Sequence, residues 1–422
     1  MIRPAALAAL MIGTACSAQP QTQPQTQAQA QPAAAMQGPQ GPQPAGADRP
    51  VPKDAPLDPS IRNVPATTGR ANLAKGKPPF AIRTIGQFAQ PFAMALLPDG
   101  RLLVTEKAGA LKLRGTDGRV VAVSGVPAVA QGGQGGLLDV AVAPDFASSD
   151  IVYLTYAEPA PSGSQLALAR ARLMPVLDGP PALEKLAVIW RSGSYGPGGQ
   201  FGATILFARD GKSLFLSSGE RQRFTPAQDP EQALGKILRL NLDGSAFAGN
   251  PAYKAGGVRA MTWSSGHRNP YGLAFDGGGR LWEVEMGPKG GDEVNLIEPG
   301  GNYGWPIVSN GDNYSGAPIP DHPSRPDLAA PKLWWNPSMS PGGMIHYTGS
   351  LFPAWRGSLL IAALSAKELI QVRLDGATAG PGVEYDMGTR IRDVAQAPDG
   401  SVWLLEDGER GAGGKLLRLT PQ

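Results

Sequence analysis

One pattern of apolar and polar positions recurs along the chain. A turn containing aspartate or glycine is followed by alternating apolar residues, which in most copies end on an acidic residue. Alternation with a period of two predicts a β-strand, because successive side chains of a strand point to opposite faces. The six copies lie at residues 96–106, 142–156, 207–220, 275–285, 352–364 and 396–407.

Strand repeats of this kind predict an all-β fold, a six-bladed β-propeller with one blade for each copy. A four-stranded sheet cannot bury both of its faces alone, whereas sheets stacked in a ring cover one another. We expect the strand at 80–86 to complete the last blade. We expect the insertions at 192–199 and 305–335 to form the mouth of the central channel, where propellers bind ligands. The alternative fold is an open array of β-sandwiches.

The composition agrees with a fold of short strands. The 422 residues include 56 glycines and 42 prolines, which favours tight turns over long helices. The formal net charge is only +3, and the sequence has no basic stripe with interleaved aromatic residues. We therefore expect no nucleic-acid partner.

The first 18 residues resemble an export signal, with an early arginine, a short apolar run and small residues. The apolar run is too short to span a bilayer. Cys16, the only cysteine, stands where a bacterial lipoprotein would be cleaved and acylated; cleavage near Ala18 without a lipid is the alternative. The protein is expected to be exported and periplasmic, with membrane contact only through a lipid anchor at Cys16.

The segment that follows, 19–75, is expected to be a disordered tether. It begins with a run rich in glutamine, proline and alanine that has no periodicity, and such a sequence cannot bury a core. The propeller domain is then expected at 76–422.

The densest group of polar, charged and turn-forming residues lies at 266–306. Strands alternate with polar turns there, an arrangement by which a β-scaffold presents side chains and backbone carbonyls at one rim. We expect this stretch to form one wall of a binding site.

Five long motifs in order carry a resemblance to a known family. They are GGQGGLLDVAVAPDF, LGKILRLNLDGS, SSGHRNPYGLAFD, GPKGGDEVNLIEPGGNYGWP and TRIRDVAQAPDG. From about Ile82 to Pro421 the chain resembles the soluble quinoprotein aldose dehydrogenases, also called the glucose/sorbosone dehydrogenase family. The resemblance implies a six-bladed propeller that binds pyrroloquinoline quinone (PQQ) and Ca²⁺. It also implies oxidation of a sugar at its anomeric carbon to a lactone, with electrons passed to an external acceptor.

The resemblance places two neighbouring residues, Arg268 and Asn269, in the quinone pocket. A quinone with three carboxylates suits a fixed guanidinium, which can also stabilise charge that develops on the quinone oxygen. The alternative for Arg268 is a turn arginine paired with a nearby acid. His267 beside them is expected to be a hydrogen-bonded structural residue.

Arg390 and Arg392 occupy alternate positions, so on a strand both point to the same face. By resemblance they hold carboxylates of the quinone. The alternative is a pair of arginines neutralised by Asp386 and Asp393.

The predicted calcium ligands are mostly backbone oxygens, which this ion accepts readily. By resemblance, the carbonyls of Gly287 and Pro288 bind the calcium linked to the quinone. Glu293 and the carbonyl of Tyr303 match ligands of a second calcium. The acids at 292–293, taken alone, equally suit a solvated turn.

Two candidates are expected to contact the sugar. Gln134, in the glycine-rich loop, matches a sugar-contacting residue of the family, with a simple flexible turn as the alternative. Trp335, next to Trp334, could stack on a sugar or quinone ring, with packing of the insertion as the alternative.

The sequence departs from the family at the catalytic base. Gln200 stands where the family has the histidine that removes the hydroxyl proton, and an amide cannot accept a proton at neutral pH. Glu220 replaces the aspartate that usually pairs with this histidine. Ser365 replaces a lysine near the quinone, and Met286 replaces a polar residue against the cofactor.

Three interpretations remain open. In the first, Glu220 has taken over as the base, with its pKa raised by burial. In the second, the protein keeps the cofactor sites but turns over slowly or oxidises another hydroxyl substrate. In the third, the propeller binds carbohydrate or hydrolyses a lactone without the quinone, using acids such as Glu106, Glu220 and Glu285. As alternative bases, His346 is expected to be packed in a strand, and His322 to face solvent.

Overall fold

The computed structural model describes residues 73–175, 179–408 and 413–422. The predicted export signal, Cys16 and residues 19–72 of the predicted tether lie outside these ranges. Among the described residues, no helix has the length and apolar character that crossing a membrane requires. The two α-helices in these ranges are short, α1 at Phe146–Ser149 and α2 at Gly257–Met261.

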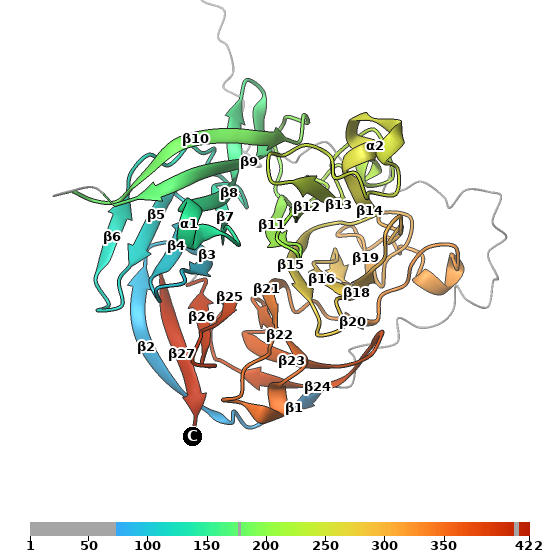
Figure 1. The fold of residues 1–422 in the computed structure, drawn as a ribbon. Coiled ribbons are helices and arrows are strands. Elements are labelled where there is room, and N and C mark those ends of the chain that lie inside the picture. The colour runs from blue at the N-terminus through green and yellow to red at the C-terminus, as the bar shows by residue number, and fades with distance from the viewer. Residues whose placement is uncertain (1–72, 176–178, 409–412) are drawn as a thin grey trace, which may run out of the picture. The chain divides into compact units, whose positions relative to one another are not determined.

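Six sheets form a closed ring, which confirms the predicted six-bladed propeller (Figure 1). The first strand of each blade is the inner strand, nearest the centre of the ring. This follows from its contacts with the first strands of the two neighbouring blades. Blades 1 to 3 consist of β3 (Pro91–Leu96), β4 (Leu102–Glu106), β5 (Ala110–Arg114) and β6 (Val120–Val123); β7 (Leu137–Val142), β8 (Ile151–Ala160), β9 (Gly163–Met174) and β10 (Ala182–Arg191); and β11 (Gly202–Phe207), β12 (Ser213–Ser218), β13 (Lys236–Asn241) and β14 (Thr262–Ser265). Blades 4 to 6 consist of β15 (Pro270–Phe275), β16 (Leu281–Glu285), β18 (Asp292–Ile297) and β20 (Leu333–Trp335); β21 (Pro341–His346), β22 (Ser358–Ala363), β23 (Glu368–Asp375) and β24 (Thr378–Asp386); and β25 (Ile391–Gln396), β26 (Val402–Glu406), β27 (Gly414–Pro421) and β2 (Phe80–Phe88). A small ribbon of β17 (Lys289–Gly290) and β19 (Gly311–Asp312) extends from blade 4.

Each of the six sequence repeats forms the same part of its blade. Its turn joins the inner strand of a blade to the second strand, and its alternating apolar residues form that second strand. The second strands are β4, β8, β12, β16, β22 and β26. They are among the most buried strands because neighbouring strands flank both of their edges and adjacent blades cover their faces, as in the fully buried β12 and β22.

The ring closes by pairing the two ends of the described chain. Strand β2 pairs antiparallel with β27, from Phe80 opposite Pro421 to Phe88 opposite Gly414. This confirms that the early strand completes the last blade, and the strand extends two residues beyond the predicted end at 86. Buried Phe80 packs edge-on against Trp355 and Tyr385 of blade 5, so closure also buries apolar surface between blades.

The boundary of the predicted tether is two residues too late. Ala74 and Lys75 form a short strand, β1, which pairs in parallel with β24 at the outer edge of blade 5. Leu73 packs on the apolar core of this blade, and Lys75 forms ion pairs with Glu368 and Glu384. The composition of the tether gave no sign of this contact, because only a neighbouring strand edge makes it favourable.

Candidate functional site

The ring gathers most of the predicted site residues at one end of the inner strands. Arg268 and Asn269 directly precede β15, and Arg390 directly precedes β25. Gln200 lies two residues before β11, and Gln134 three residues before β7. Residues far apart in the sequence thus meet on one rim, because inner strands start at the same end of a propeller.

Gln200 lies between an acid and an arginine. With its amide nitrogen facing Glu220 and its oxygen facing Arg268, it donates to Glu220 Oε1 and accepts from Arg268 Nη2 at 2.6 Å. Its backbone N–H donates to Gln134 Oε1 at 2.6 Å. The structure therefore brings Gln134, Gln200, Glu220 and Arg268 together, and the amide occupies the space between the two charged groups.

Glu220 is fully buried and is held by backbone donors. Its carboxylate accepts from the N–H groups of Gln222 at 3.0 Å and of Arg223 and Phe224 at 2.5 Å each. Burial raises the pKa of Glu220, while the charge of Arg268 and these amides oppose the rise. The acid has the raised pKa that a base requires, but Gln200 covers the side that faces the rim.

The Arg268 guanidinium binds backbone carbonyls at the rim. Its Nη1 donates to the carbonyl oxygens of Met286 at 2.9 Å and Gly287 at 2.5 Å. Its Nε is buried without a hydrogen-bond partner, and its Cζ lies 5.2 Å from the ring centre of Trp305 and 6.0 Å from that of Tyr314. An unpaired cationic donor and a cation-binding carbonyl thus stand side by side, which fits both an anionic quinone and a calcium ion.

Asn269 and His267 are fixed by buried hydrogen bonds. Asn269 accepts from the Gly202 N–H at 3.1 Å, and its backbone N–H donates to Glu285 at 3.2 Å. His267 Nδ1 lies 3.1 Å from Glu285 Oε1 and its Nε2 lies 2.8 Å from Ser264 Oγ. The ring also stacks on Tyr303. His267 is hydrogen-bonded through both ring nitrogens, as expected.

Three of the four predicted calcium residues line one small cavity. Gly287, Glu293 and Tyr303 surround it together with Glu285, and its volume of ≈ 10 Å³ is close to that of one water-sized sphere. The fourth, Pro288, is buried but does not line this cavity. An ion-sized space bordered by carboxylates fits a hard cation.

Behind this cavity lies a buried group of acids. The Asn295 amide donates to Glu283 at 3.0 Å and to Glu285 and Glu293 at 3.4 Å each. Burial, followed by the charge of Glu285, raises the pKa of Glu283. His322 Nε2 lies 3.3 Å from Glu293 Oε1, and this side chain is buried, so the expectation that His322 faces solvent is wrong. Its Pro-rich loop folds inward because Glu293 offers the imidazole a partner.

Arg390 and Arg392 share a single counter-ion, Asp407. Arg390 Nε donates to one of its carboxylate oxygens at 2.9 Å, and Arg392 donates to the other at 2.9 and 2.8 Å. The predicted alternative partners are engaged elsewhere: Asp393 accepts from the Met94 N–H at 2.8 Å and Asp386 from the Gly388 N–H at 2.8 Å. Asp407 leaves the two arginines with one net positive charge at the rim.

The remaining predicted residues divide into two groups. Ser365 is exposed near the rim and donates to Ser340 Oγ at 2.9 Å, and Met286 lies beside the amide of Asn269. Trp335 is not brought to the site: it is fully buried in the core between blades 4 and 5, and its indole N–H donates to Glu384 at 3.4 Å. Strand pairing of β20 with β18 turns this ring inward, so it cannot stack on a sugar.

His346 also lies away from the site. It is the last residue of β21, at the opposite end of that strand from the rim. Burial lowers the pKa of His346, as expected for an imidazole packed in a strand. It offers no base to the site.

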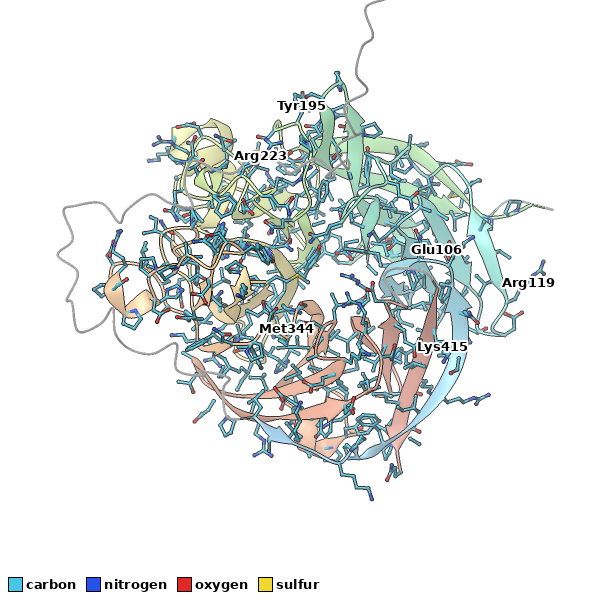
Figure 2. All side chains as sticks on the ribbon, turned by 180° about the vertical axis from the view of Figure 1, so that it is seen from behind. Glu106, Arg119, Tyr195, Arg223, Met344 and Lys415 are labelled. Carbon is cyan, nitrogen blue, oxygen red and sulfur yellow. The ribbon has the colours of Figure 1, made fainter. Side chains whose placement is uncertain are left out.

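Arg221 is a rim residue that sequence reasoning missed. Its buried guanidinium donates to the carbonyls of Gly196, Gly198 and Gly199 at 3.1 Å each and stacks 3.8 Å from the ring centre of Phe201. The neighbouring Arg223 donates to the Tyr195 carbonyl, and Figure 2 shows Arg223 and Tyr195 on the same side of the ring. Two arginines after the acid in SGERQR were the available signal. They fix the predicted insertion at 192–199 against the site.

Comparison with known proteins identifies the family of the chain. The glucose/sorbosone dehydrogenase family model matches residues 88–418. Aldose sugar dehydrogenase YliI of Escherichia coli K12 is 38% identical over 343 residues, which cover 79% of this chain and 90% of that protein. A solved glucose dehydrogenase superposes with a TM-score of 0.76 at 41% identity, covering 81% of this chain and all of the other. The PQQ-bound aldose sugar dehydrogenase of Streptomyces coelicolor superposes with a TM-score of 0.66 at 28% identity, covering 82% of this chain and all of the other. The chain therefore belongs to the glucose/sorbosone dehydrogenase family, a family of oxidoreductases.

Proposed function

We propose that this protein oxidises an aldose or related sugar at its anomeric carbon to a lactone, using PQQ and Ca²⁺. The observation that carries the proposal is the contact of Arg268 with Gln200 on one side and with the Gly287 carbonyl on the other. A cationic donor, a proton-accepting acid behind the amide and an oxygen ligand then share one rim. The PQQ-bound relative from Streptomyces coelicolor supports the choice of cofactor.

The residues that would hold the quinone are cationic or amide side chains. Arg268 offers its unpaired Nε, while Arg390 and Arg392 keep net positive charge beside Asp407. The amide nitrogen of Asn269 lies 3.7 Å from the sulfur of Met286. Ser365 would add a hydroxyl donor to the quinone site. When bound, PQQ supplies a two-electron acceptor for hydride. The arginines would bind its carboxylates and stabilise negative charge on its oxygens.

The residues that would hold calcium are Gly287, Pro288, Glu293 and Tyr303. In the structure Arg268 donates to the Gly287 carbonyl, so a cation already lies against this oxygen. Calcium would take this oxygen with the carboxylate of Glu293 and backbone oxygens, the ligand types that this ion prefers.

We assign the role of base to Glu220. Gln134 would orient the sugar hydroxyl, since its amide reaches the backbone of Gln200. For Glu220 to accept the hydroxyl proton, the Gln200 side chain must rotate away from Glu220 Oε1, where it donates in the structure. Burial raises the pKa of Glu220, which favours uptake of the hydroxyl proton. The charge of Arg268 acts in the opposite direction and favours the ionised carboxylate until the proton arrives.

The proposal is tested by reconstituting the purified protein with Ca²⁺ and PQQ and adding a panel of aldoses. Oxidation of a sugar should bleach the absorbance of the oxidised quinone in a single turnover. If the quinone binds but no aldose bleaches it, the proposed reaction is refuted and the binding site stands. If no quinone binds, a carbohydrate-binding or lactone-hydrolysing protein is the better account.

Electrons would pass to an external acceptor, and the expected export signal would place the reaction in the periplasm. Mass spectrometry of the mature N-terminus checks export and acylation of Cys16 together. A full-length, unmodified N-terminus would contradict both.

A further inference from the structure

Five blades contribute to the site described above, and blade 1 occupies the corresponding place without a role. The residue just before its inner strand β3 is Gln90, in the position that Asn269 has before β15 and Arg390 has before β25. Its second strand β4 ends on Glu106, as β16 ends on Glu285. The sixth sector of the rim therefore carries the same kinds of residue at the same positions.

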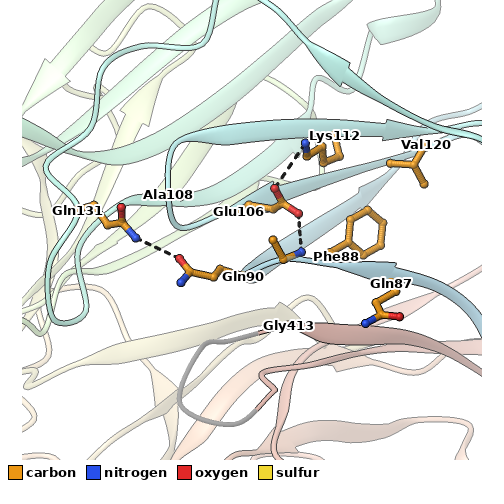
Figure 3. Close-up of a pocket in the computed structure, with 10 residues that line it drawn as sticks. Gln87, Phe88, Gln90, Glu106, Ala108, Lys112, Val120, Gln131 and Gly413 are labelled. Atoms are coloured by element: carbon orange, nitrogen blue, oxygen red, sulfur yellow. Dashed lines mark hydrogen bonds and ion pairs between the residues drawn. The ribbon is translucent and has the colours of Figure 1, made fainter.

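This sector is hollowed into an open groove of ≈ 780 Å³ (Figure 3). Three glutamines, Gln87, Gln90 and Gln131, line it together with Glu106 and Lys112. Val120, which is 39% exposed, adds apolar surface. The groove thus combines several amides with a lining that is mostly apolar.

The charges of the groove cancel. Lys112 Nζ lies 3.6 Å from Glu106 Oε2, and the other carboxylate oxygen accepts from the Ala89 N–H at 2.7 Å. Such a paired groove gives no preference for an ionic ligand. A neutral ligand fits it better.

The amides keep free hydrogen-bonding groups. Gln131 donates to Gln90 Oε1 at 3.1 Å, which leaves Gln90 Nε2 as a free donor and Gln131 Oε1 as a free acceptor within the described part of the chain. Donors and acceptors side by side match hydroxyl groups, which both donate and accept. Neutral character and paired amides together indicate a polyhydroxylated ligand.

The glycine-rich loop connects the groove to the site. Gln131 lies three residues before Gln134, and a tight turn closed by the Gly135 N–H to the Gly132 carbonyl at 2.8 Å lies between them. Three residues of extended chain span at most about 10 Å, and a turn spans less. Lys107 Nζ donates to the Gly133 carbonyl at 2.7 Å and holds this loop against blade 1. A di- or trisaccharide bridges such a separation.

We propose that the blade 1 groove binds the further sugar units of a neutral oligosaccharide whose reducing end lies at Gln134 and Gln200. The proposal rests on the proposed function, because it takes the oxidised sugar to lie at that site. It assigns Gln90 and Gln131 as specificity-determining residues. They bind the hydroxyls of the second and third units, and they do not touch the reacting carbon.

The test compares glucose with maltotriose in the holoenzyme. The double variant Gln90→Ala/Gln131→Ala should lower kcat/KM for maltotriose about tenfold, the loss expected for one to two hydrogen bonds, and change that for glucose less than about twofold. Gln396→Ala is the matched control, because it truncates a glutamine at the opposite end of an inner strand. The proposal is overturned if the ratio of kcat/KM for maltotriose to kcat/KM for glucose is the same in the double variant as in the wild type.

A second measurement separates this proposal from the oxidation itself. Maltotriitol has no anomeric carbon to oxidise at its reduced end, so its binding to the wild-type protein can be followed by calorimetry without turnover. Binding to the wild type that the double variant loses supports the groove even if no aldose is oxidised. Equal binding to both proteins, or no binding to either, refutes the groove while leaving sugar oxidation to its own test.

Discussion

Two acids at matching places in the ring behave in opposite ways. Glu220 follows the second strand of blade 3, and Asp407 follows the second strand of blade 6. Backbone amides and the neutral Gln200 surround Glu220, whereas two arginines bind Asp407. Burial raises the pKa of Glu220; it also acts to raise that of Asp407, but Arg392 and Arg390 lower the pKa of Asp407 below its ordinary value.

The difference shows how one scaffold position serves two kinds of chemistry. An acid that contacts only neutral groups keeps an affinity for protons, so it can act as a base. An acid that contacts two guanidinium groups stays charged and fixes them as anion binders. Both side chains are buried, and the partners of each acid set the direction of its pKa shift.

The largest expected effect is the loss of the base. Glu220→Gln should lower the rate of quinone reduction by sugar about 10² to 10⁴-fold, the usual contribution of a positioned base. Quinone binding should remain, because Arg268, Arg390 and Arg392 are untouched. Stopped-flow absorbance of the bound quinone measures both. Turnover equal to that of the wild type would rule out Glu220 as the base.

Asp407, the acid that two arginines bind, should contribute to the stability of the fold. Asp407→Asn leaves two arginines without their counter-ion, so the free energy of unfolding should fall by about 3 kcal/mol. Urea titration measures the change. Asp399→Asn, in the exposed pair with Arg418, is the control and should cost less than about 1 kcal/mol. If both variants lose the same free energy of unfolding, the buried Asp407 ion pairs stabilise the fold no more than the exposed pair does.

Gln200 can be replaced by histidine, the residue that the family uses as the base at this position. Gln200→His should raise kcat about tenfold, because an imidazole between Glu220 and the rim can accept the proton without prior side-chain rotation. The backbone of Gln200 has φ of 55°, a region that histidine and asparagine tolerate better than most residues. Gln200→Asn is therefore the control, expected to give no gain. A histidine variant as slow as the asparagine variant would argue against proton transfer at this position.

The same contrast predicts two different pH dependences. Because the pKa of Glu220 is raised above 4.5, kcat/KM should increase with pH through an apparent pKa above that value, and Glu220→Gln should lose this step. Because the pKa of Asp407 is lowered below 3.8, its ion pairs should contribute stability above about pH 4, lost as pH falls through the folded-state pKa. A wild-type activity profile that is flat above pH 4.5 would contradict the first expectation.

The smallest expected effect concerns the loop on the Glu220 side. Arg221→Lys keeps the charge but cannot reach the carbonyls of Gly196, Gly198 and Gly199 together, so the loop should loosen. We expect kcat/KM to fall about fivefold, with faster amide hydrogen exchange confined to 192–200. Arg172→Lys, in a half-exposed ion pair on blade 2, is the control. Exchange rates in the loop that match the wild type would show that Arg221 does not hold it.

The sequence by itself determined the strands, the six blades and the positions of most rim residues. Alternation with period two and the glycine turns are local properties, so they specify each second strand without knowledge of its neighbours. The residues just before β15 and β25 are polar, and the resemblance of their motifs to a known family assigned Arg268, Asn269 and Arg390 to one quinone pocket.

Only the tertiary structure decided which charged groups meet. Arg390 and Arg392 pair with Asp407 instead of with Asp386 or Asp393, because the register of β25 against β26 brings Asp407, the residue directly after β26, beside them. Trp335 turns into the core and His322 turns toward Glu293 for the same reason. Contacts between strands depend on register and ring closure, which join residues distant in sequence, and no local pattern contains that information.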